Sequence, residues 1–234
     1  MPEGVRVYAV GDIHGRDDLF EALLKQIDAD DATRPAKRTI LVLLGDFVDR
    51  GPDSASVVER AAALSKSGAE VRCLMGNHEE VFLLACEGNR EALRMFARIG
   101  GRETAISYGL TAQQYESTDY EELGALLGEH VPHPHVEFLR TLEDVIEIGD
   151  YVFVHAGIRP GVPLGEQKRG DLRWIRNDFL RHADAHEKFV VHGHTITEDV
   201  DIRPNRIGID TGAYESGRLT AIGLDGEERW YLST

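Results

Sequence analysis

The sequence predicts an α/β fold in which a single domain spans residues 1–234. Short runs rich in Val, Ile and Leu are apolar at successive positions, which is typical of strands buried on both faces. Amphipathic helical patterns follow the first two runs. Strand and helix therefore alternate twice, as they do in parallel βαβ units.

Five apolar runs are expected to form strands, and each leads into a polar motif. They are Val5–Val10 before GDIHG, Thr39–Leu44 before GDFVDRG, Val71–Met75 before GNHEE, Tyr151–Val154 before HAGIRP and Lys188–Val191 before HGHT. Between the first two runs, Asp17–Ile27 carries a helical apolar stripe with acidic residues in its first turn. Pro52–Ser65 opens with Pro and Asp, which is a helix-start signal.

The middle and the end of the chain follow other patterns. Residues 79–140 are polar and helical, with a break at Gly100 and Gly101, and we interpret them as a small helical cap between the two motif-bearing halves. Residues 201–232 alternate short strands with turns, which predicts an antiparallel meander.

The composition excludes several classes of protein. The chain has 26 Lys and Arg against 41 Asp and Glu, a net charge of −15, which argues against binding to a nucleic-acid backbone. No apolar run approaches the roughly 18–20 residues that a membrane span needs, so no membrane partner is expected. Cys73 and Cys86 cannot form a disulfide framework, which predicts a cytoplasmic protein. We expect a monomer or a weak oligomer.

Candidate metal ligands follow all five predicted strands. They are Asp12, His14, Asp46, Asn77, His155 and His194. The carboxyl ends of strands in an open α/β sheet are where ligands bind. Carboxylate, imidazole and amide ligands without a thiolate suit Mn²⁺, Fe²⁺ or Zn²⁺, and Mn²⁺ is the expected ion. Six ligands are too many for one catalytic ion, and they fit two ions bridged by a shared carboxylate. Two divalent ions carry more positive charge than the carboxylates of Asp12 and Asp46 cancel, so such a site suits a negatively charged phosphate substrate.

Simpler interpretations exist for these residues. Asp and Asn after a strand also serve as helix caps and turn residues. In HGHT the ligand could be either histidine; we favour His194 and assign His192 to the end of the strand or to a place behind the ligands.

Other histidines and both cysteines have simpler interpretations too. His130, His133 and His135 lie beside two prolines, which predicts a loop entering a helix over 136–142. His182 and His186 share a helical face without a third ligand, so a solvated face is favoured. Neither cysteine lies in a Cys-x₅-Arg loop, and no Gly-Lys-Ser/Thr follows the glycines, which excludes a cysteine-dependent phosphatase and a P-loop.

The five polar motifs together resemble the signature blocks of the phosphoprotein phosphatase family of metallophosphoesterases, in particular its short bacterial and phage branch of the lambda type. The resemblance implies the calcineurin-like fold, a central β-sandwich of two mixed sheets flanked by helices. It also implies that Asp12, His14 and Asp46 hold the first ion. Asp46 would bridge to the second ion, which Asn77, His155 and His194 complete.

The same resemblance assigns the catalytic side chains. It makes His78 the general acid, with Asp49 fixing its ring, and Arg50 a phosphate ligand. Arg176 is the expected second phosphate-binding arginine, with Arg173 and Arg159 as competitors.

The expected function is metal-dependent phosphomonoester hydrolysis by direct in-line attack of a metal-activated water. The favoured hypothesis is a serine/threonine protein phosphatase, with phosphotyrosine as an additional substrate. The expected partner of the protein is then a phosphorylated protein or peptide. The alternative is a diadenosine tetraphosphatase or a related nucleotide hydrolase. Symmetrical enzymes of that kind typically lack the aspartate before Arg in the second block and carry GNHD in the third. The VDRG and GNHEE of this chain therefore favour the protein phosphatase.

An inactive metal-binding scaffold is not expected, because it would have lost a ligand, His78 or Arg50, and all are present. A DNA nuclease of the wider fold does not suit the acidic chain.

Overall fold

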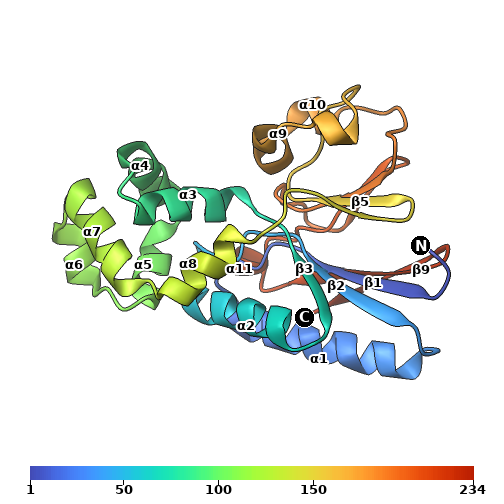
Figure 1. The fold of residues 1–234 in the computed structure, drawn as a ribbon, viewed down its shortest axis with the longest axis horizontal. Coiled ribbons are helices and arrows are strands. Elements are labelled where there is room, and N and C mark those ends of the chain that lie inside the picture. The colour runs from blue at the N-terminus through green and yellow to red at the C-terminus, as the bar shows by residue number, and fades with distance from the viewer.

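Two five-stranded mixed sheets pack against each other in the computed structural model, which describes residues 1–234 (Figure 1). The first sheet has the order β10-β9-β1-β2-β3, and the second has the order β4-β5-β6-β8-β7. The strands of the first are β1 (Val5–Val10), β2 (Arg38–Leu43), β3 (Glu70–Cys73), β9 (Thr220–Asp225) and β10 (Glu228–Ser233). Those of the second are β4 (Ile146–Ile148), β5 (Tyr151–Val154), β6 (Phe189–His192), β7 (Asp201–Ile202) and β8 (Arg206–Gly208).

In both sheets the strands that lead into the polar motifs run parallel. β1, β2 and β3 are parallel neighbours, and β5, β6 and β8 form the matching parallel set. The antiparallel strands lie outside these sets: β9 and β10 extend the first sheet, and β4 and β7 close the edges of the second. The carboxyl ends of the parallel strands therefore gather at one edge of the sandwich.

The alternation of side chains along each strand divides the core into layers. In β1, Val7 and Ala9 face the second sheet, whereas Tyr8 and Val10 face the helices on the other side. This is why the runs read as continuously apolar, because both faces of the strand are covered.

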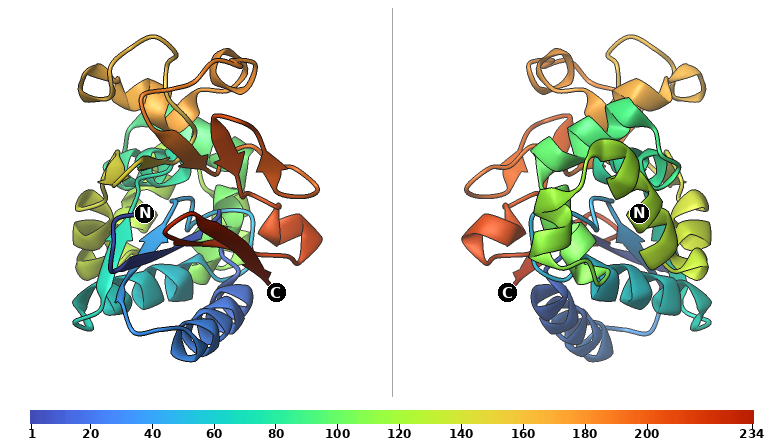
Figure 2. Two further views of the ribbon diagram at one scale, coloured as in Figure 1. Left: turned by 90° about the vertical axis from the view of Figure 1, so that its right-hand side faces the viewer. Right: turned by 90° about the vertical axis from the view of Figure 1, so that its left-hand side faces the viewer.

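Helices cover the outer faces of both sheets (Figures 1 and 2). α1 (Asp17–Thr33) and α2 (Ser54–Lys66) lie on the first sheet and bury Phe20 and Val57 against it. The short helices η1 (Leu164–Glu166), α9 (Arg169–Trp174) and α10 (Asn177–Leu180) cover the second sheet, where Phe179 packs on Val190 and its neighbours.

Six helices follow β3 and form the lobe at one end of the sheets in Figure 1. They are α3 (Asn77–Cys86), α4 (Arg90–Ile99), α5 (Gly101–Ser107), α6 (Ala112–Ser117), α7 (Tyr120–His130) and α8 (His133–Arg140). Gly100 separates α4 from α5 and has a left-handed φ of +110°. Phe82, Phe96 and Tyr108 stack inside the lobe and share one apolar cluster with β1 and α2, so the lobe is an extension of the main core.

The elements agree with the expectations in type and differ at their ends. The five predicted strands form within two residues of their expected bounds, and residues 77–140 are helical. α1 continues beyond Ile27 to Thr33, and α2 starts at Ser54 because Asp53 caps it, its side chain accepting from Ser56 N at 3.1 Å.

The expected antiparallel meander over residues 201–232 is wrong. β7 and β8 form a hairpin in the second sheet, the four-residue helix α11 (Ala213–Ser216) follows, and β9 and β10 form a hairpin in the first sheet. The strands were identified, but β8 pairs parallel with β6 and β9 pairs with β1, which are contacts across the chain that a local pattern does not specify.

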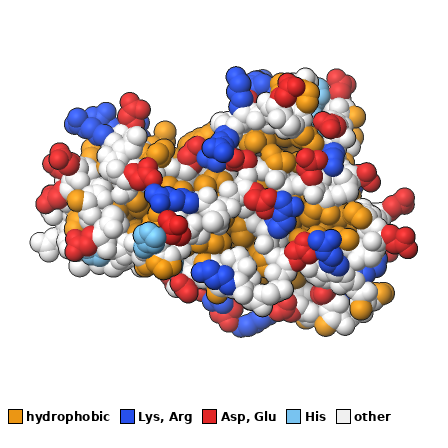
Figure 3. Space-filling model, in the orientation of Figure 1, with side chains coloured by type: hydrophobic (Ala, Val, Ile, Leu, Met, Phe, Trp, Pro, Cys, Tyr) orange, Lys and Arg blue, Asp and Glu red, His pale blue; other side chains and the backbone are white.

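None of the helices combines the length and the apolar composition that a membrane-crossing segment requires. On the face seen in Figure 3, acidic and basic side chains are interspersed.

Candidate metal centre

The six predicted ligands converge at the shared edge of the two sheets. Asp12 and His14 follow β1, Asp46 follows β2 and Asn77 opens α3 after β3. His155 and His194 follow β5 and β6, so the second sheet contributes its ligands from the same edge. All six are buried. The six residues therefore lie together, because the parallel strands of each sheet present their carboxyl ends at the shared edge.

The backbone is left-handed at this edge in a way found nowhere else in the chain. The only residues other than glycine with positive φ are His14, Asp46, Asp49, Arg50 and His194. That conformation is costly for residues with a Cβ, and it clusters at functional sites where the surrounding structure holds it in place.

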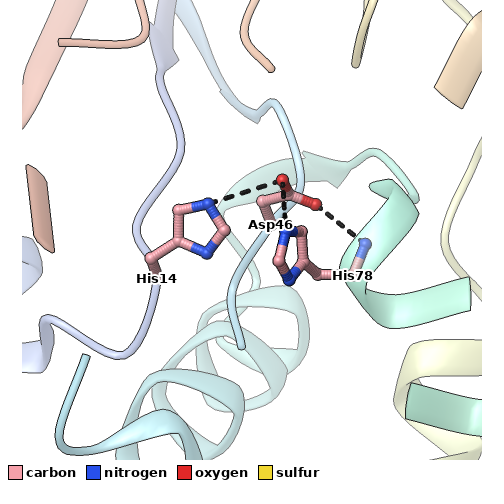
Figure 4. A group of neighbouring side chains, drawn as sticks. All are labelled: His14, Asp46 and His78. Atoms are coloured by element: carbon pink, nitrogen blue, oxygen red, sulfur yellow. Dashed lines mark hydrogen bonds and ion pairs between the residues drawn. The ribbon is translucent and has the colours of Figure 1, made fainter. Parts of the chain in front are cut away.

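Asp46 lies at the centre of the cluster (Figure 4). Its Oδ2 atom lies 3.4 Å from His155 Nε2, 3.5 Å from His14 Nε2 and 3.8 Å from His78 Nε2. Its Oδ1 atom accepts a hydrogen bond from His78 N at 3.1 Å. One carboxylate therefore contacts side chains from both sheets, as a bridging ligand must.

In two of these histidines, a contact with a backbone carbonyl determines which ring nitrogen carries the hydrogen. Nδ1 of His14 lies 2.8 Å from Val48 O, and Nδ1 of His155 lies 2.9 Å from Leu44 O. A carbonyl oxygen only accepts, so each Nδ1 carries the hydrogen. In the neutral rings Nε2 then presents a lone pair toward the Asp46 carboxylate. Lone pairs and carboxylate oxygens that face one another need a cation between them, and the donor set fits a divalent metal.

Two groups of side chains could each hold an ion. One comprises His14, Asp46 and His78, and the other comprises Asp46, His155 and His194; within each group the ligand atoms lie within 4.8 Å of one another. Asn77 joins the second group, with its Oδ1 atom 3.0 Å from His155 Nε2. Burial lowers the pKa of His194 to about 2, and its Nε2 atom is buried without a hydrogen-bond partner. The lowered pKa suits a neutral metal ligand, and the nitrogen that faces the group is Nδ1 of His194, 3.2 Å from His155 Nε2.

Asp12 stands beside the first group. Its Oδ2 atom accepts from His194 N at 2.9 Å, and its Oδ1 atom is buried without a partner. A Cβ at Gly193 would overlap Asp12 Oδ1, so only glycine fits next to it. Asp12 thus offers a free oxygen to an ion, although His78 completes the three-residue group in its place.

Sequence reasoning missed Asp210 as part of this region. Asp210 is buried, its Oδ2 atom has no partner, and burial raises its pKa to about 6. Burial, reinforced by the charge of Asp210, also raises the pKa of Asp12. Asp210 belongs to the stretch IDTG, which follows β8 directly, and an aspartate at the end of a strand is the signal that the sequence offers.

Glu79 is a second residue that sequence reasoning did not identify. Its carboxylate is fully buried and accepts four backbone N–H groups, from Gly76 and from all three residues of Asp46–Val48, at 2.7–3.2 Å. These bonds hold the left-handed backbone of Asp46 in place. An acidic residue in the first turn of a helix was the only signal in the sequence.

Asp49, the expected partner of His78, lies against its ring. His78 Nδ1 lies 2.7 Å from Asp49 Oδ2, and Thr104 Oγ1 donates to the other oxygen of Asp49 at 2.7 Å. Burial alone would lower the pKa of His78, but the carboxylates of Asp46 and Asp49 raise it above its usual value. This arrangement leaves Nε2 facing the site.

Arg50 lies over the same cluster. Its guanidinium donates to His14 Nε2 and to His78 Nε2, each at 3.1 Å. The positive charge therefore lies beside the candidate metal ligands, where it could meet an anionic oxygen.

Only one of the three arginines competing for the second phosphate position is available. Arg159 is held by Asp171 and Asp178, and Arg173 is held by Glu80 and Asp144. Arg176 is exposed and makes one long contact, 3.4 Å, to His194 O, which places it next to a candidate ligand.

The remaining histidines lie away from the ligands. His192 ends β6 and packs on Phe179 near Arg206. His135 belongs to α8, which starts at His133 rather than at residue 136, and contacts Glu59 and Tyr108.

One protein family matches most of this chain. The sequence model of the family described as calcineurin-like phosphoesterase covers residues 5–216.

Curated relatives carry a common name. The chain is 26% identical over 240 residues to the asymmetrical bis(5'-nucleosyl)-tetraphosphatase of Anoxybacillus flavithermus, covering 91% of this chain and 88% of that protein. The protein of the same name from Bacillus subtilis is 27% identical over 234 residues with the same coverage. A symmetrical bis(5'-nucleosyl)-tetraphosphatase of Acidovorax sp. is 46% identical, but over only 88 residues, 38% of this chain and 28% of that protein.

Solved structures share the fold. A candidate diadenosine tetraphosphatase superposes with a TM-score of 0.67 at 22% identity, covering 100% of this chain and 96% of that one. A mutant of a cold-active protein tyrosine phosphatase superposes with a TM-score of 0.59 at 19% identity, covering 99% and 80%. The expected fold is confirmed. The expected lambda-type protein phosphatase branch is corrected, because the close relatives are tetraphosphatases.

Proposed function

The chain belongs to the calcineurin-like phosphoesterase family, and from that premise we propose that it hydrolyses dinucleoside polyphosphates at a dimetal centre. One observation supports the hydrolytic chemistry above the others. The Oδ2 atom of Asp46 lies within 3.8 Å of three histidine nitrogens, and Arg50 contacts two of those same histidines. A phosphate fits this combination of cation-seeking ligands and a guanidinium.

The residues of the site fit two divalent ions, which we propose to be Mn²⁺. Asp12, His14 and Asp46 would hold one ion, and Asp46, Asn77, His155 and His194 would hold the other. Bound there, the ions would supply an acidified water and charge neutralisation for attack at phosphorus. Such an ion would satisfy the unpartnered buried atom Asp12 Oδ1. On His194, Nδ1 would face the second ion, since it lies 3.2 Å from His155 Nε2.

Arg50 and Arg176 would bind the phosphate oxygens. A guanidinium forms two parallel hydrogen bonds with a phosphate, which fixes its orientation as well as its position. To do so, Arg50 must turn away from Nε2 of His78, and that atom is then free to carry a proton. Substrate binding and preparation of His78 are therefore one event in this proposal.

His78 would donate its Nε2 proton to the leaving oxygen, with Asp49 holding the ring from the other side. The oxygen of water forms a bond to phosphorus and the bridging P–O bond breaks, so one phosphoanhydride becomes two phosphates. Asymmetrical cleavage of a dinucleoside tetraphosphate gives a nucleoside monophosphate and a nucleoside triphosphate.

The substrate class rests on the end-to-end similarity to two asymmetrical tetraphosphatases. The motif difference that favoured a protein phosphatase concerns Asp49 and the third block. In this structure Asp49 orients His78, and Glu79 holds the Asp46 loop. Neither task depends on whether the phosphate is attached to a peptide or to a nucleoside. The two residues therefore do not select between a peptide and a nucleotide, and the protein-phosphatase reading loses its support.

A direct comparison of substrates tests this proposal. Protein stripped with chelator and reloaded with Mn²⁺ is assayed with diadenosine tetraphosphate and with a phosphothreonine peptide, and kcat/KM is measured for each. We expect the dinucleotide to be preferred by about a hundredfold or more. Equal kcat/KM values for the two substrates, or a higher value for the peptide, would contradict the proposal. The variant Asp46→Asn, inactive on both, is the control for contaminating phosphatase. Parallel reloading with Fe²⁺ and Zn²⁺ tests the metal.

A further inference from the structure

We propose that Tyr214 is the platform on which the site receives the nucleobase of its substrate, so that the chain recognises a nucleotide by its base as well as by its phosphates. This inference rests on the proposed function and adds a specificity-determining residue to it. Tyr214 lies in α11, a segment that the catalytic assignment does not use.

Tyr214 borders the candidate metal centre directly. Its ring centroid lies 5.5 Å from that of His14, in an edge-to-face arrangement with an interplanar angle of 83°. The guanidinium carbon of Arg50 lies over the same ring at 4.9 Å from its centroid. Tyr214 therefore contacts one candidate metal ligand and one candidate phosphate ligand, and a substrate whose phosphate reaches them must pass beside it.

The ring is not a member of the core. Tyr214 is partly exposed and belongs to none of the three apolar clusters, whereas its neighbour Ala213 is buried in one of them. Part of Tyr214 is therefore exposed to solvent at the border of the candidate metal centre.

The turn that carries Tyr214 is held rigidly. Gly212 and Gly217 bound α11 with left-handed φ values of +67° and +72°. Gly212 N donates to Asp210 Oδ1 at 2.9 Å, and Arg16 donates to Ala213 O at 3.0 Å. The backbone that carries the aromatic ring is thus held in place before a ligand arrives, which reduces the entropy lost on binding.

A cavity of about 560 Å³ adjoins the same turn. It lies between the segment after His194 and the α11 turn, and its lining includes Thr197, Glu198, Gly212, Glu215 and Ser216. The wall also contains Arg218, but its guanidinium pairs with Asp199 at 3.2 Å, so the carboxylates of Glu198 and Glu215 are not neutralised by it. These carboxylates oppose a phosphate chain, whereas hydroxyl groups suit an uncharged ribose or base. The charge of the lining therefore indicates that phosphates turn toward Arg50 and the nucleoside toward α11.

A nucleobase is the ligand chemistry that suits this arrangement. Every base presents a π-face that stacks on an aromatic side chain, and each such contact contributes about 5- to 150-fold in affinity. A nearby guanidinium adds a cation–π contribution on the Tyr ring.

Calorimetric titration of the Mn²⁺-loaded protein tests the assignment. Adenosine monophosphate and ribose 5-phosphate are the probes, since they differ only in the base. The wild type and Tyr214→Phe are expected to bind adenosine monophosphate about 5- to 150-fold more tightly than ribose 5-phosphate. In Tyr214→Ala the two affinities become equal, while the affinity for ribose 5-phosphate and the Mn²⁺ stoichiometry stay at wild-type values.

Three results would overturn the inference. They are equal affinities for both probes in the wild type, a base preference that survives in Tyr214→Ala, and an equal loss of affinity for both probes in that variant, which would make Tyr214 a support of the metal centre. The kcat/KM comparison above separates this failure from that of the proposed function. A wild type that prefers the phosphopeptide but shows a Tyr214-dependent base preference overturns only the proposed function. A wild type that prefers the dinucleotide without one overturns only the role of Tyr214.

Discussion

The strand-end loops and the rim around them are built in different ways. In the loops, the candidate ligand side chains are buried; Glu79 holds the loop backbone, and Asp49 holds the ring of His78. On the rim, Arg176 is exposed and Tyr214 partly so, and short helices carry both. The left-handed non-glycine residues all belong to the loops.

This difference between loops and rim indicates which part of the molecule serves the reaction and which part serves the choice of substrate. In the proposed function, the loops supply the hydrolytic chemistry, and their buried geometry leaves little freedom for change. The rim would select the group that is attached to the phosphate. Family motifs lie in the loops, so a motif comparison identifies the reaction and leaves the substrate open.

The largest effect is expected in the loops, from Asp46→Asn. The substitution keeps the shape but removes the negative charge that contacts His14, His78 and His155. We expect both metals to bind weakly and activity to fall by several orders of magnitude, as measured by metal analysis and kcat/KM. Asp53→Asn, at the cap of α2, is the matched control and should retain both metals. Ordinary turnover by Asp46→Asn with full metal content would refute the bridging role.

His78→Asn should separate proton donation from metal binding. We expect unchanged metal content and a loss of about 10²–10⁴ in the rate with an alkyl phosphate ester, whose leaving group needs a proton. The loss should be much smaller with p-nitrophenyl phosphate and with diadenosine tetraphosphate, because their leaving groups are better. The measurement is kcat for each substrate, and equal losses on all three would argue against a general acid.

On the rim, Arg176→Ala should have a smaller effect. A hydrogen bond to a charged group contributes about 1.5–3 kcal/mol, so we expect a decrease of about 10- to 100-fold in kcat/KM and a weaker inhibition by inorganic phosphate. Arg159→Ala is the control, since Arg159 is engaged by Asp171 and Asp178 and should change kcat/KM only slightly. If the two variants behaved alike, Arg176 would not be a phosphate ligand.

The smallest effect is expected on the folding stability of the protein, through His192. Burial lowers the pKa of His192 to about 4. Folded His192 therefore stays neutral while the unfolded chain takes up a proton below pH 6.5, so its contribution to stability is present above that pH and is lost as the pH falls toward 4. At pH 5 the loss is about 2 kcal/mol. Urea unfolding of chelator-treated wild type and His192→Gln at pH 7 and pH 5 should show a pH effect smaller by that amount in the variant; an identical pH effect would exclude His192 as its source.

The sequence predicted the loops better than the rim for a physical reason. Each strand ends where its motif begins, and the parallel strands of one sheet must present those ends at one edge, so Asp12, Asp46 and Asn77 could be placed together without a structure. His155 follows a strand of the other sheet, and its expected place beside them came from the family resemblance. The hydrogen bond between Asp12 and His194 joins residues 182 positions apart, yet both lie at such ends.

The residues that escaped prediction depend on contacts with no local pattern. The four amide partners of Glu79 lie on two different loops, and Tyr214 meets His14 because the two hairpins at the end of the chain join different sheets. The predicted meander was wrong for the same reason, because the two hairpins belong to different sheets. Arg176 could be proposed from the sequence, but its competitors are removed only by their observed salt bridges.

Anomalous X-ray scattering from crystals grown with Mn²⁺ tests most directly that one dimetal centre lies where the loops of both sheets meet. The account predicts two manganese peaks at this edge, one on each side of the Asp46 carboxylate, with His14 near one and with His155 and His194 near the other. A single peak, or two peaks that do not share Asp46, would contradict it.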